Sequence, residues 1–310
     1  MSFTKQVKEE IINIKASKTE IISILSAFFR NSVKINEKAI SLLTESIEIA
    51  NWLKEGVKNL YNVNIKIDKI SNNGFNKNNI YVVIIEEKIG IILSDLSVID
   101  DNNKLLENPK EYIISDLEEK KAYLRGIFLS KGSINDPKTA QYHLEFLFDN
   151  KYESVLVQRI LNDFDLNSKI LLRDKKYMVY IKDSEKISDF LKVIGTYNAV
   201  MYYENIRVLK EQKNITNRLN NCEQANIDKV VEAANNQIKQ IEYIDKVMGI
   251  DLLDDKLKEV VFYRNKYPDA SLLELSEIIS LETNKKITKS GLNHRFRKIK
   301  EIYDRLKSMK

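Results

Sequence analysis

The chain has 310 residues, of which 43% are hydrophobic and 31% charged, with 3 prolines and a formal net charge of +5. This length and composition predict a globular protein of about two domains and exclude a disordered or fibrous chain. The net charge is too small to identify a binding partner. The longest apolar runs, at residues 80–85 and 89–93, are far shorter than the ~18–20 residues that cross a bilayer, and no signal-peptide pattern opens the chain. We therefore expect a cytoplasmic protein without membrane insertion.

The first third of the chain alternates helical and strand-like patterns. Ser2 is suited to cap a first helix, and alternation of apolar and polar residues indicates strands further on. An Asn-Gly region at Asn72–Asn79 predicts a hairpin turn between two strands. In chain order, the expected elements are helices at 3–14 and 18–31, a less regular segment at 41–49, a helix at 49–61, and strands at 63–70 and 80–85.

The same order of patterns then returns. The second series comprises a helix at 118–131, a strand at 142–148, a helix at 154–163, strands at 169–172 and 177–181, and a helix at 184–194. An internal duplication is the simplest account, because two similar α+β units can share one core about a pseudo-two-fold axis.

The C-terminal third is helical throughout. An apolar stripe predicts a helix at 217–248, which Gly249 ends, and we expect this helix to connect two domains. Three further helices follow, at 254–266, at 272–280 after the cap Ser271, and from Thr288 or Ser290 onward. This is a helix-turn-helix pattern. The expected divisions are 1–205, 206–250 for the connector, and 251–310 for the helix-turn-helix domain.

The last of these helices is strongly basic. From Lys285 to Lys310 ten lysines and arginines stand against two acidic residues, a local net charge of +8. A recognition helix presents such a face to the DNA major groove, where Asn293 suits adenine and either Arg297 or Lys289 suits guanine or a phosphate. The alternative is a solvated basic face. The candidate DNA-binding residues are Lys286, Lys289, Ser290, Asn293, His294, Arg295, Arg297, Lys298 and Lys300, of which Lys286, Arg295 and Lys300 best suit phosphates.

Residues for the common catalytic sites are scarce. Cys222 is the only cysteine, which excludes an intrachain disulfide and a cysteine-built zinc site, and we expect it to be a buried structural thiol. The two histidines, His143 and His294, fall in different predicted domains and cannot form a metal cluster or a Ser/His triad within one domain, so we expect His143 to be structural. The isolated Gly126 and Gly132 match no phosphate-binding loop. We expect no catalytic residues, no bound metal and no cofactor.

One segment resembles a known motif. Leu124–Gly132, followed by Ser133–Pro137, resembles the LAGLIDADG helix of homing endonucleases, and more closely the form that it takes in the WhiA family of bacterial regulators. Leu25–Val33 is a weaker first copy. Segments similar to WhiA proteins also occur, in the same order along the chain, at Met1–Thr4, Val7–Glu10, Asn217–Asn226 and Lys289–Arg295.

The resemblance implies an α+β fold, with a two-repeat LAGLIDADG homing-endonuclease-like N-terminal domain followed by an all-α helix-turn-helix domain. In active endonucleases of this type, the eighth motif position of each helix supplies an acidic ligand for the divalent metal. Ser32 and Lys131 occupy these positions here. A hydroxyl and a cation do not replace two carboxylates around Mg²⁺, so we expect a degenerate nuclease without cleavage activity. Asp136 and Glu145 lie nearby and leave a displaced metal site open as an alternative.

In this fold the strand surface faces DNA, so its cations form a possible second surface for DNA or another partner; they are Lys66, Lys69, Arg173, Lys175 and Lys176. The alternative is that they are solvated edge charges. The sequence thus predicts a non-enzymatic, nucleoid-associated DNA-binding protein, and the resemblance implies a regulator linked to transcription, cell division and chromosome segregation. Its expected partners are double-stranded DNA and other transcription or division proteins. An interaction scaffold tethered to the nucleoid and a metal-dependent endonuclease are the alternatives.

Overall fold

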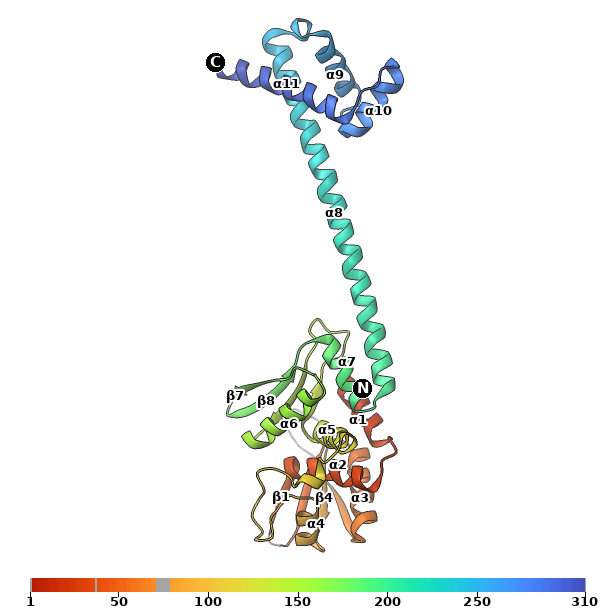
Figure 1. The fold of residues 1–310 in the computed structure, drawn as a ribbon, viewed down its shortest axis with the longest axis vertical. Coiled ribbons are helices and arrows are strands. Elements are labelled where there is room, and N and C mark those ends of the chain that lie inside the picture. The colour runs from red at the N-terminus through yellow and green to blue at the C-terminus, as the bar shows by residue number, and fades with distance from the viewer. Residues whose placement is uncertain (1, 37, 71–78, 310) are drawn as a thin grey trace. The chain divides into compact units, whose positions relative to one another are not determined.

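The structure is a computed structural model that describes residues 2–36, 38–70 and 79–309 (Figure 1). Contacts between residues divide the chain into two compact units, Met1–Lys210 and Glu211–Lys310. The long helix α8, Tyr197–Met248, begins in the first unit and ends in the second. The three divisions expected from the sequence stay a prediction.

The first unit repeats one arrangement of helices and strands. After α1 (Phe3–Ile12), the first copy comprises α2 (Lys18–Ser32), β1 (Val33–Ile35), β2 (Ile40–Thr44), α3 (Ile47–Tyr61), β3 (Ile65–Ile70), β4 (Ile80–Ile85) and α4 (Ile89–Asp95). After the short helix η1 (Glu111–Ile113), the second comprises α5 (Leu117–Lys131), β5 (Gly132–Ile134), β6 (Leu144–Phe148), α6 (Lys151–Asp163), β7 (Lys169–Arg173), β8 (Lys176–Ile181) and α7 (Ser184–Val193).

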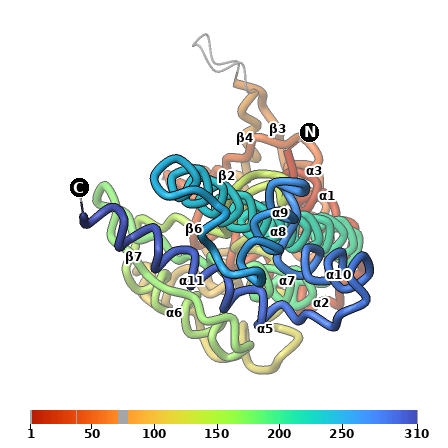
Figure 2. The backbone as a smooth tube through the Cα atoms, turned by 90° about the horizontal axis from the view of Figure 1, so that it is seen from above, coloured from red at the N-terminus to blue at the C-terminus, as the bar shows by residue number. Residues whose placement is uncertain are grey.

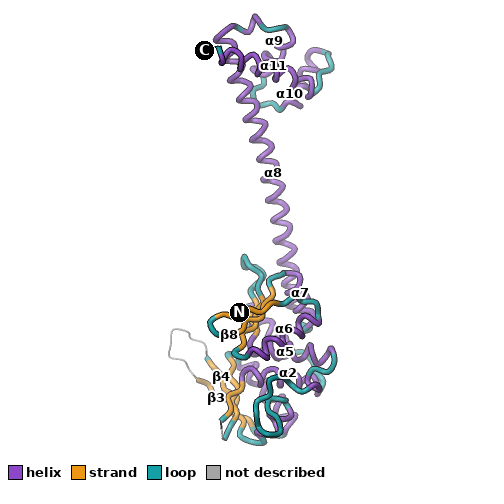
Figure 3. Tube along the Cα trace, turned by 60° about the vertical axis from the view of Figure 1, so that its left-hand side comes forward, coloured by secondary structure: helices purple, strands orange, loops and turns teal. Residues whose placement is uncertain are grey.

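The strand order shows that the two copies share one topology. The described residues form two four-stranded antiparallel sheets, ordered β1-β2-β4-β3 and β5-β6-β8-β7. The strands lie on one side of the unit and the helices on the other (Figure 3). The repeat expected from the sequence is confirmed, although the β1–β2 hairpin was not predicted. The predicted turn at Asn72–Asn79 lies almost wholly outside the described residues.

The central helices α2 and α5 pack tightly against each other. A Cβ atom on Gly126 of α5 would lie 2.2 Å from the carbonyl oxygen of Ile24 and 2.8 Å from Cβ of Ala27, both on α2. Atoms cannot approach so closely, so glycine is required where the helices cross. The crossing belongs to the single hydrophobic core of the unit, which draws on both repeats.

α8 begins twenty residues before the helix expected at 217–248. The carboxylate of Glu10 on α1 accepts hydrogen bonds from the backbone N–H groups of Asn198 and Ala199, at 2.8 and 3.0 Å. This cap comes from a residue far away in the sequence, so no local pattern marks the start of the helix. The expectation for Cys222 was wrong: it is exposed on α8, because this stretch of the helix packs against no other described element.

The second unit is a small helical bundle (Figure 2). It comprises the C-terminal part of α8, the short helix η2 (Ile250–Leu252), α9 (Asp255–Lys266), α10 (Leu272–Thr283) and α11 (Lys289–Ser308). The bundle has its own buried core, to which these helices contribute Ile241, Ile244, Leu257, Val260, Leu275, Ile279, Leu292, Phe296 and Ile299.

Candidate nucleic-acid interface

The turn between α10 and α11 is fixed by local hydrogen bonds. Ser271 and Glu274 form a capping box at the start of α10, and Asn284 ends this helix in the left-handed conformation, with φ of 54°. The Ser280 hydroxyl accepts a hydrogen bond from the N–H of Ile287 at 3.0 Å. The Thr288 hydroxyl caps α11 by accepting from the N–H of Gly291 at 3.1 Å. Thr288, the first of the two starts expected for this helix, is therefore the cap.

A buried arginine on α9 stabilises the loop before α10 and packs against α11. Arg264 on α9 donates a hydrogen bond to the carbonyl oxygen of Ala270 at 2.6 Å and to that of Pro268 at 3.3 Å, and its guanidinium lies 5.4 Å from the centre of the Phe296 ring. These contacts join α9, the loop before α10 and the middle of α11. This role could not be predicted from the sequence, because arginine at a helix end resembles a solvated charge.

α11 has a buried face and an opposite polar face. Leu292, Phe296 and Ile299 are buried in the bundle core. Ser290, Asn293, His294 and Arg297 are exposed, and their spacing places them together on one face of the helix. The four expected lysines, Lys286, Lys289, Lys298 and Lys300, are also exposed. The structure thus leaves eight of the nine candidate DNA-binding residues open to solvent around one helix.

Arg295 is the exception. Its Nη1 atom lies 2.7 Å from a carboxylate oxygen of Glu259 on α9, and the two side chains are 21% and 20% exposed. Nη1 also donates a hydrogen bond to the carbonyl oxygen of Lys256 at 3.5 Å. The structure therefore directs Arg295 toward α9, where it joins two helices of the bundle, and a phosphate would have to compete with Glu259 for it.

The five cations expected on the strand surface do not form one basic patch. Three of them already have an acidic partner: Lys66 pairs with Glu86 at 2.8 Å, Arg173 with Asp174 at 3.7 Å, and Lys176 with Asp149 at 3.2 Å.

Their positions on the strands also differ. Lys69 is an odd number of residues from Lys66 on β3, so it belongs to the opposite face of that strand. Lys175 lies in the turn between β7 and β8 with φ of 64°. Two exposed apolar side chains, Leu147 and Leu171, are 37% and 50% exposed on the same face as Arg173 and Lys176.

The two residues at the positions that bind the metal in active nucleases cannot bind a divalent metal here. Ser32 and Lys131 are the last residues of α2 and α5, and Lys131 pairs with Asp149 at 3.5 Å. A hydroxyl and an ammonium group cannot supply the anionic oxygen ligands that Mg²⁺ requires.

The two nearby acidic residues are engaged elsewhere. Asp136 accepts a hydrogen bond from the Tyr202 hydroxyl at 3.3 Å, and Glu145 is 3.0 Å from Nε2 of His143, whose ring lies against Tyr180. Among the described residues no group of three or more His, Cys, Asp and Glu side chains is placed to hold a metal ion. In the same part of the chain, no helix has the length and apolarity to cross a membrane.

Two sheets of one topology around paired central helices, with a separate helix-turn-helix bundle, define a LAGLIDADG-like protein that carries a DNA-binding type of module. Family models match the chain in three parts: the WhiA N-terminal LAGLIDADG-like domain at residues 15–99, the WhiA LAGLIDADG-like domain at 120–213, and the WhiA C-terminal HTH domain at 216–303. The chain therefore belongs to the WhiA family.

Full-length relatives agree with this assignment. The chain is 39% identical, over 99% of its length and 98% of theirs, to proteins named "Probable cell division protein WhiA" from Bacillus mycoides (strain KBAB4) and Bacillus cereus (strain G9842). The crystal structure of full-length WhiA from Thermatoga maritima is 25% identical, with a TM-score of 0.60 over 98% of this chain and 99% of that one.

Proposed function

We propose that this protein is a non-enzymatic regulator that binds double-stranded DNA through α11 and acts in cell division, transcription and chromosome segregation. The observation that carries the proposal is the row Ser290, Asn293 and Arg297, which is exposed on a helix whose other face is anchored in the bundle core. The names of the relatives support the link to cell division.

The chemistry of the row suits direct reading of bases. The major groove is about 12 Å wide and admits a helix, and a recognition helix enters it with its N-terminal end. Asn293 can form two hydrogen bonds with adenine, and Arg297 can do so with guanine, each worth about 1–3 kcal/mol of discrimination. The exposed lysines at 286, 289, 298 and 300 would contact phosphates and fix the position of the helix on the duplex.

The test is a fluorescence-anisotropy titration of genomic promoter fragments across a salt series. The full chain should bind with a steep negative dependence on salt, and the Asn293→Ala/Arg297→Ala variant should lose its preference between fragments while it keeps weaker, salt-dependent binding. Lys58→Met, at an exposed position near the end of α3, is the control and should bind as the wild type does. Equal preference in the wild type and the double variant would remove α11 as the reader.

A second candidate function is an interaction scaffold that the helix-turn-helix unit tethers to the nucleoid. The exposed face of the sheet formed by β5 to β8 favours the scaffold function. Leu147 and Leu171 are exposed on this face, and the cations beside them already pair with acidic residues. Apolar side chains suit a protein partner better than a phosphate backbone. Deletion of 284–310 should then abolish DNA binding and leave expression of the bound genes unchanged, whereas a regulator would change their expression.

A further inference from the structure

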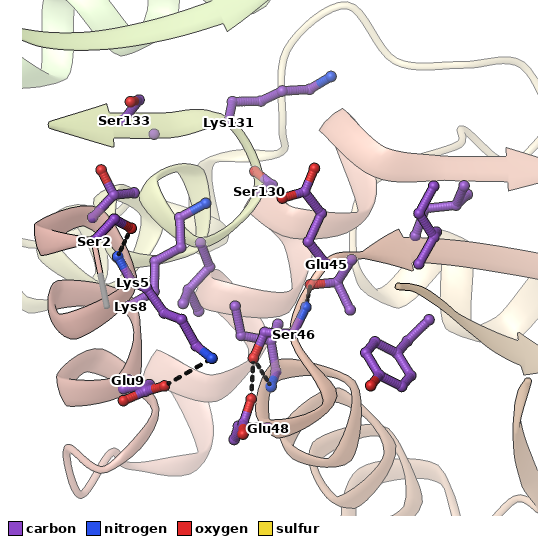
Figure 4. A pocket seen from close by; sticks show the side chains of 18 of the residues that line it. Ser2, Lys5, Lys8, Glu9, Glu45, Ser46, Glu48, Ser130, Lys131 and Ser133 are labelled. Carbon is purple, nitrogen blue, oxygen red and sulfur yellow. Dashed lines mark hydrogen bonds and ion pairs between the residues drawn. The ribbon is translucent and has the colours of Figure 1, made fainter. Parts of the chain in front are cut away.

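The first unit contains a cavity of about 1010 Å³ to which both repeats contribute (Figure 4). Lys5 and Lys8 line it from α1, Glu45 and Ser46 from the start of α3, and Lys131 from the end of α5. Cavities of roughly 300–1,000 Å³ are typical of small-molecule sites. The size therefore suits a small organic ligand, and the lining is polar and carries both signs of charge.

Lys8 differs from the other cations of the cavity. Lys5 pairs with Glu9 at 3.6 Å, and both Lys131 and Lys176 pair with Asp149. Among the described residues, the Lys8 ammonium group has no hydrogen-bond acceptor and no carboxylate within ion-pair distance. Its side chain extends into the cavity from α1 (Figure 4).

The Lys8 side chain is half-buried and lies beside an aromatic ring. Its Nζ atom lies 5.9 Å from the centre of the Phe128 ring. Burial lowers the pKa of the Lys8 ammonium group to about 8, and the negative charge of Glu45 opposes part of this effect. A buried ammonium group is unfavourable unless an anion neutralises it. The cavity therefore has a place for an anion beside Lys8.

The remaining lining groups narrow the kind of anion. The first turn of α3 borders the cavity with Ser46 and Ile49, and the free N–H groups of a helix N-terminus favour a nearby anion. Glu45 and Glu48 also border it, and Ser46 donates a hydrogen bond to Glu48 at 2.6 Å. Carboxylates repel the repeated phosphates of a DNA backbone, but they accept hydrogen bonds from the hydroxyl or amino groups of a small molecule.

We infer that this cavity binds a small phosphate monoester, whose phosphate lies at Lys8 and whose hydroxyl or amino groups donate hydrogen bonds to Glu45 and Glu48. Residues from α1 and from both repeats would hold the ligand, so its binding would stabilise the first unit. The inference does not rest on DNA binding by α11, which belongs to the second unit.

The experiment measures how fast each lysine of the full chain reacts with an amine-specific reagent, followed by mass spectrometry of its peptides. Adenosine monophosphate and inorganic phosphate are the probes, and sodium chloride at equal ionic strength is the reference. Both probes should slow labelling of Lys8 several-fold and leave the exposed Lys58 unchanged. Unchanged labelling of Lys8 with both probes would overturn the inference.

Two further arms separate the source of the phosphate and the role of the side chain. A short DNA duplex should not protect Lys8, and protection by the duplex alone would assign the cavity to a DNA phosphate and overturn the small-molecule site. Equilibrium dialysis with radiolabelled adenosine monophosphate should show binding to the wild type and to Lys58→Met, and at least a tenfold (~1.4 kcal/mol) loss in Lys8→Met. Equal binding by Lys8→Met would also overturn the inference.

Discussion

Arg30 on α2 and Glu153 on α6 form an ion pair at 3.1 Å in which the two side chains are only 4% and 3% exposed. The guanidinium also donates hydrogen bonds to the carbonyl oxygens of Ser97 and Leu106, at 2.8 and 3.0 Å, and the Tyr123 hydroxyl donates to Glu153. The pair joins the two repeats at the end of the central helices, so the repeats are connected by a buried charge network as well as by the apolar core.

We expect Glu153→Ala to destabilise the first unit by about 3–5 kcal/mol, because it leaves the charge of Arg30 buried without a partner. Urea unfolding followed by the fluorescence of Trp52, the only tryptophan and part of the first unit, measures this change. Glu86→Ala is the matched control: it breaks the exposed pair with Lys66 and should cost less than about 1 kcal/mol. Similar losses in the two variants would contradict the role of the buried pair.

A second prediction concerns the crossing of α2 and α5. Gly126→Ala should destabilise the first unit by about 1–3 kcal/mol or more, because the new methyl group would meet the backbone of Ile24 and force the helices apart. Gly56→Ala in α3 is the control, since the nearest atoms to its methyl group would belong to Leu25 and Ile21, at 3.7 Å or beyond. This control should be neutral or stabilising by up to about 1 kcal/mol. Urea unfolding followed by Trp52 fluorescence measures both changes in stability. A neutral Gly126→Ala would mean that the two helices are less closely packed than described.

Most of the strands, the repeat and the helix-turn-helix could be predicted because local patterns specify them. Alternating residues mark β3, the capping box of Ser271 marks α10, and the apolar stripe of α11 marks its buried face. What could not be predicted depends on partners distant in the sequence. Glu10 caps α8 from α1, and Arg30 finds Glu153 on another repeat.

Among the candidate DNA-binding residues, the sequence placed the exposed face correctly because helical spacing decides it. It assigned Arg295 to phosphates and Arg297 to the groove-facing side, but it could not show that Arg295 is paired within the bundle. That pairing depends on the position of Glu259 on α9. The use of the exposed face to read DNA stays a proposal.

Different residues of α11 should affect DNA binding in different ways. Asn293→Ala should lower affinity for preferred fragments by about 1–3 kcal/mol and relax the choice of base at one position. Lys298→Ala should weaken binding to all fragments alike and reduce the slope of log K against log salt by about 1. Anisotropy titrations over a salt series measure both quantities. If Lys298→Ala changed the choice of base instead, the division between reading and positioning residues would be wrong.

Arg295 provides a further prediction. Arg295→Ala and Glu259→Ala should each destabilise the second unit, by on the order of 1 kcal/mol, because either change breaks the same ion pair. Neither should reduce the salt dependence of DNA binding. Circular dichroism melting and the anisotropy series test the two statements. A phosphate contact would give another result, in which Arg295→Ala lowers the slope and Glu259→Ala leaves it unchanged or raises it.

The pKa of Lys8 makes the stability of the first unit depend on pH in a defined direction. Burial lowers this pKa from 10.5 to about 8, so between these values the unfolded chain binds the proton that the folded chain has lost. Stability then rises with pH relative to a variant without the amine. Below about pH 8 both states are protonated, and the whole unfavourable effect of the buried charge is present.

Lys8→Met should therefore exceed the wild type in stability most clearly near pH 7, and the difference should shrink as pH approaches about 10.5. A tenfold change in proton affinity corresponds to about 1.4 kcal/mol, so the total change across this range is at most about 3.5 kcal/mol. Urea unfolding followed by Trp52 at several pH values measures it, and Lys58→Met, whose amine is exposed, should show no such trend. The pH-independent part of the difference reflects the exchange of one side chain for another, so only the trend tests the burial of the charge. A constant difference between wild type and Lys8→Met would show that the Lys8 amine is solvated, and would also remove the reason for an anion beside it.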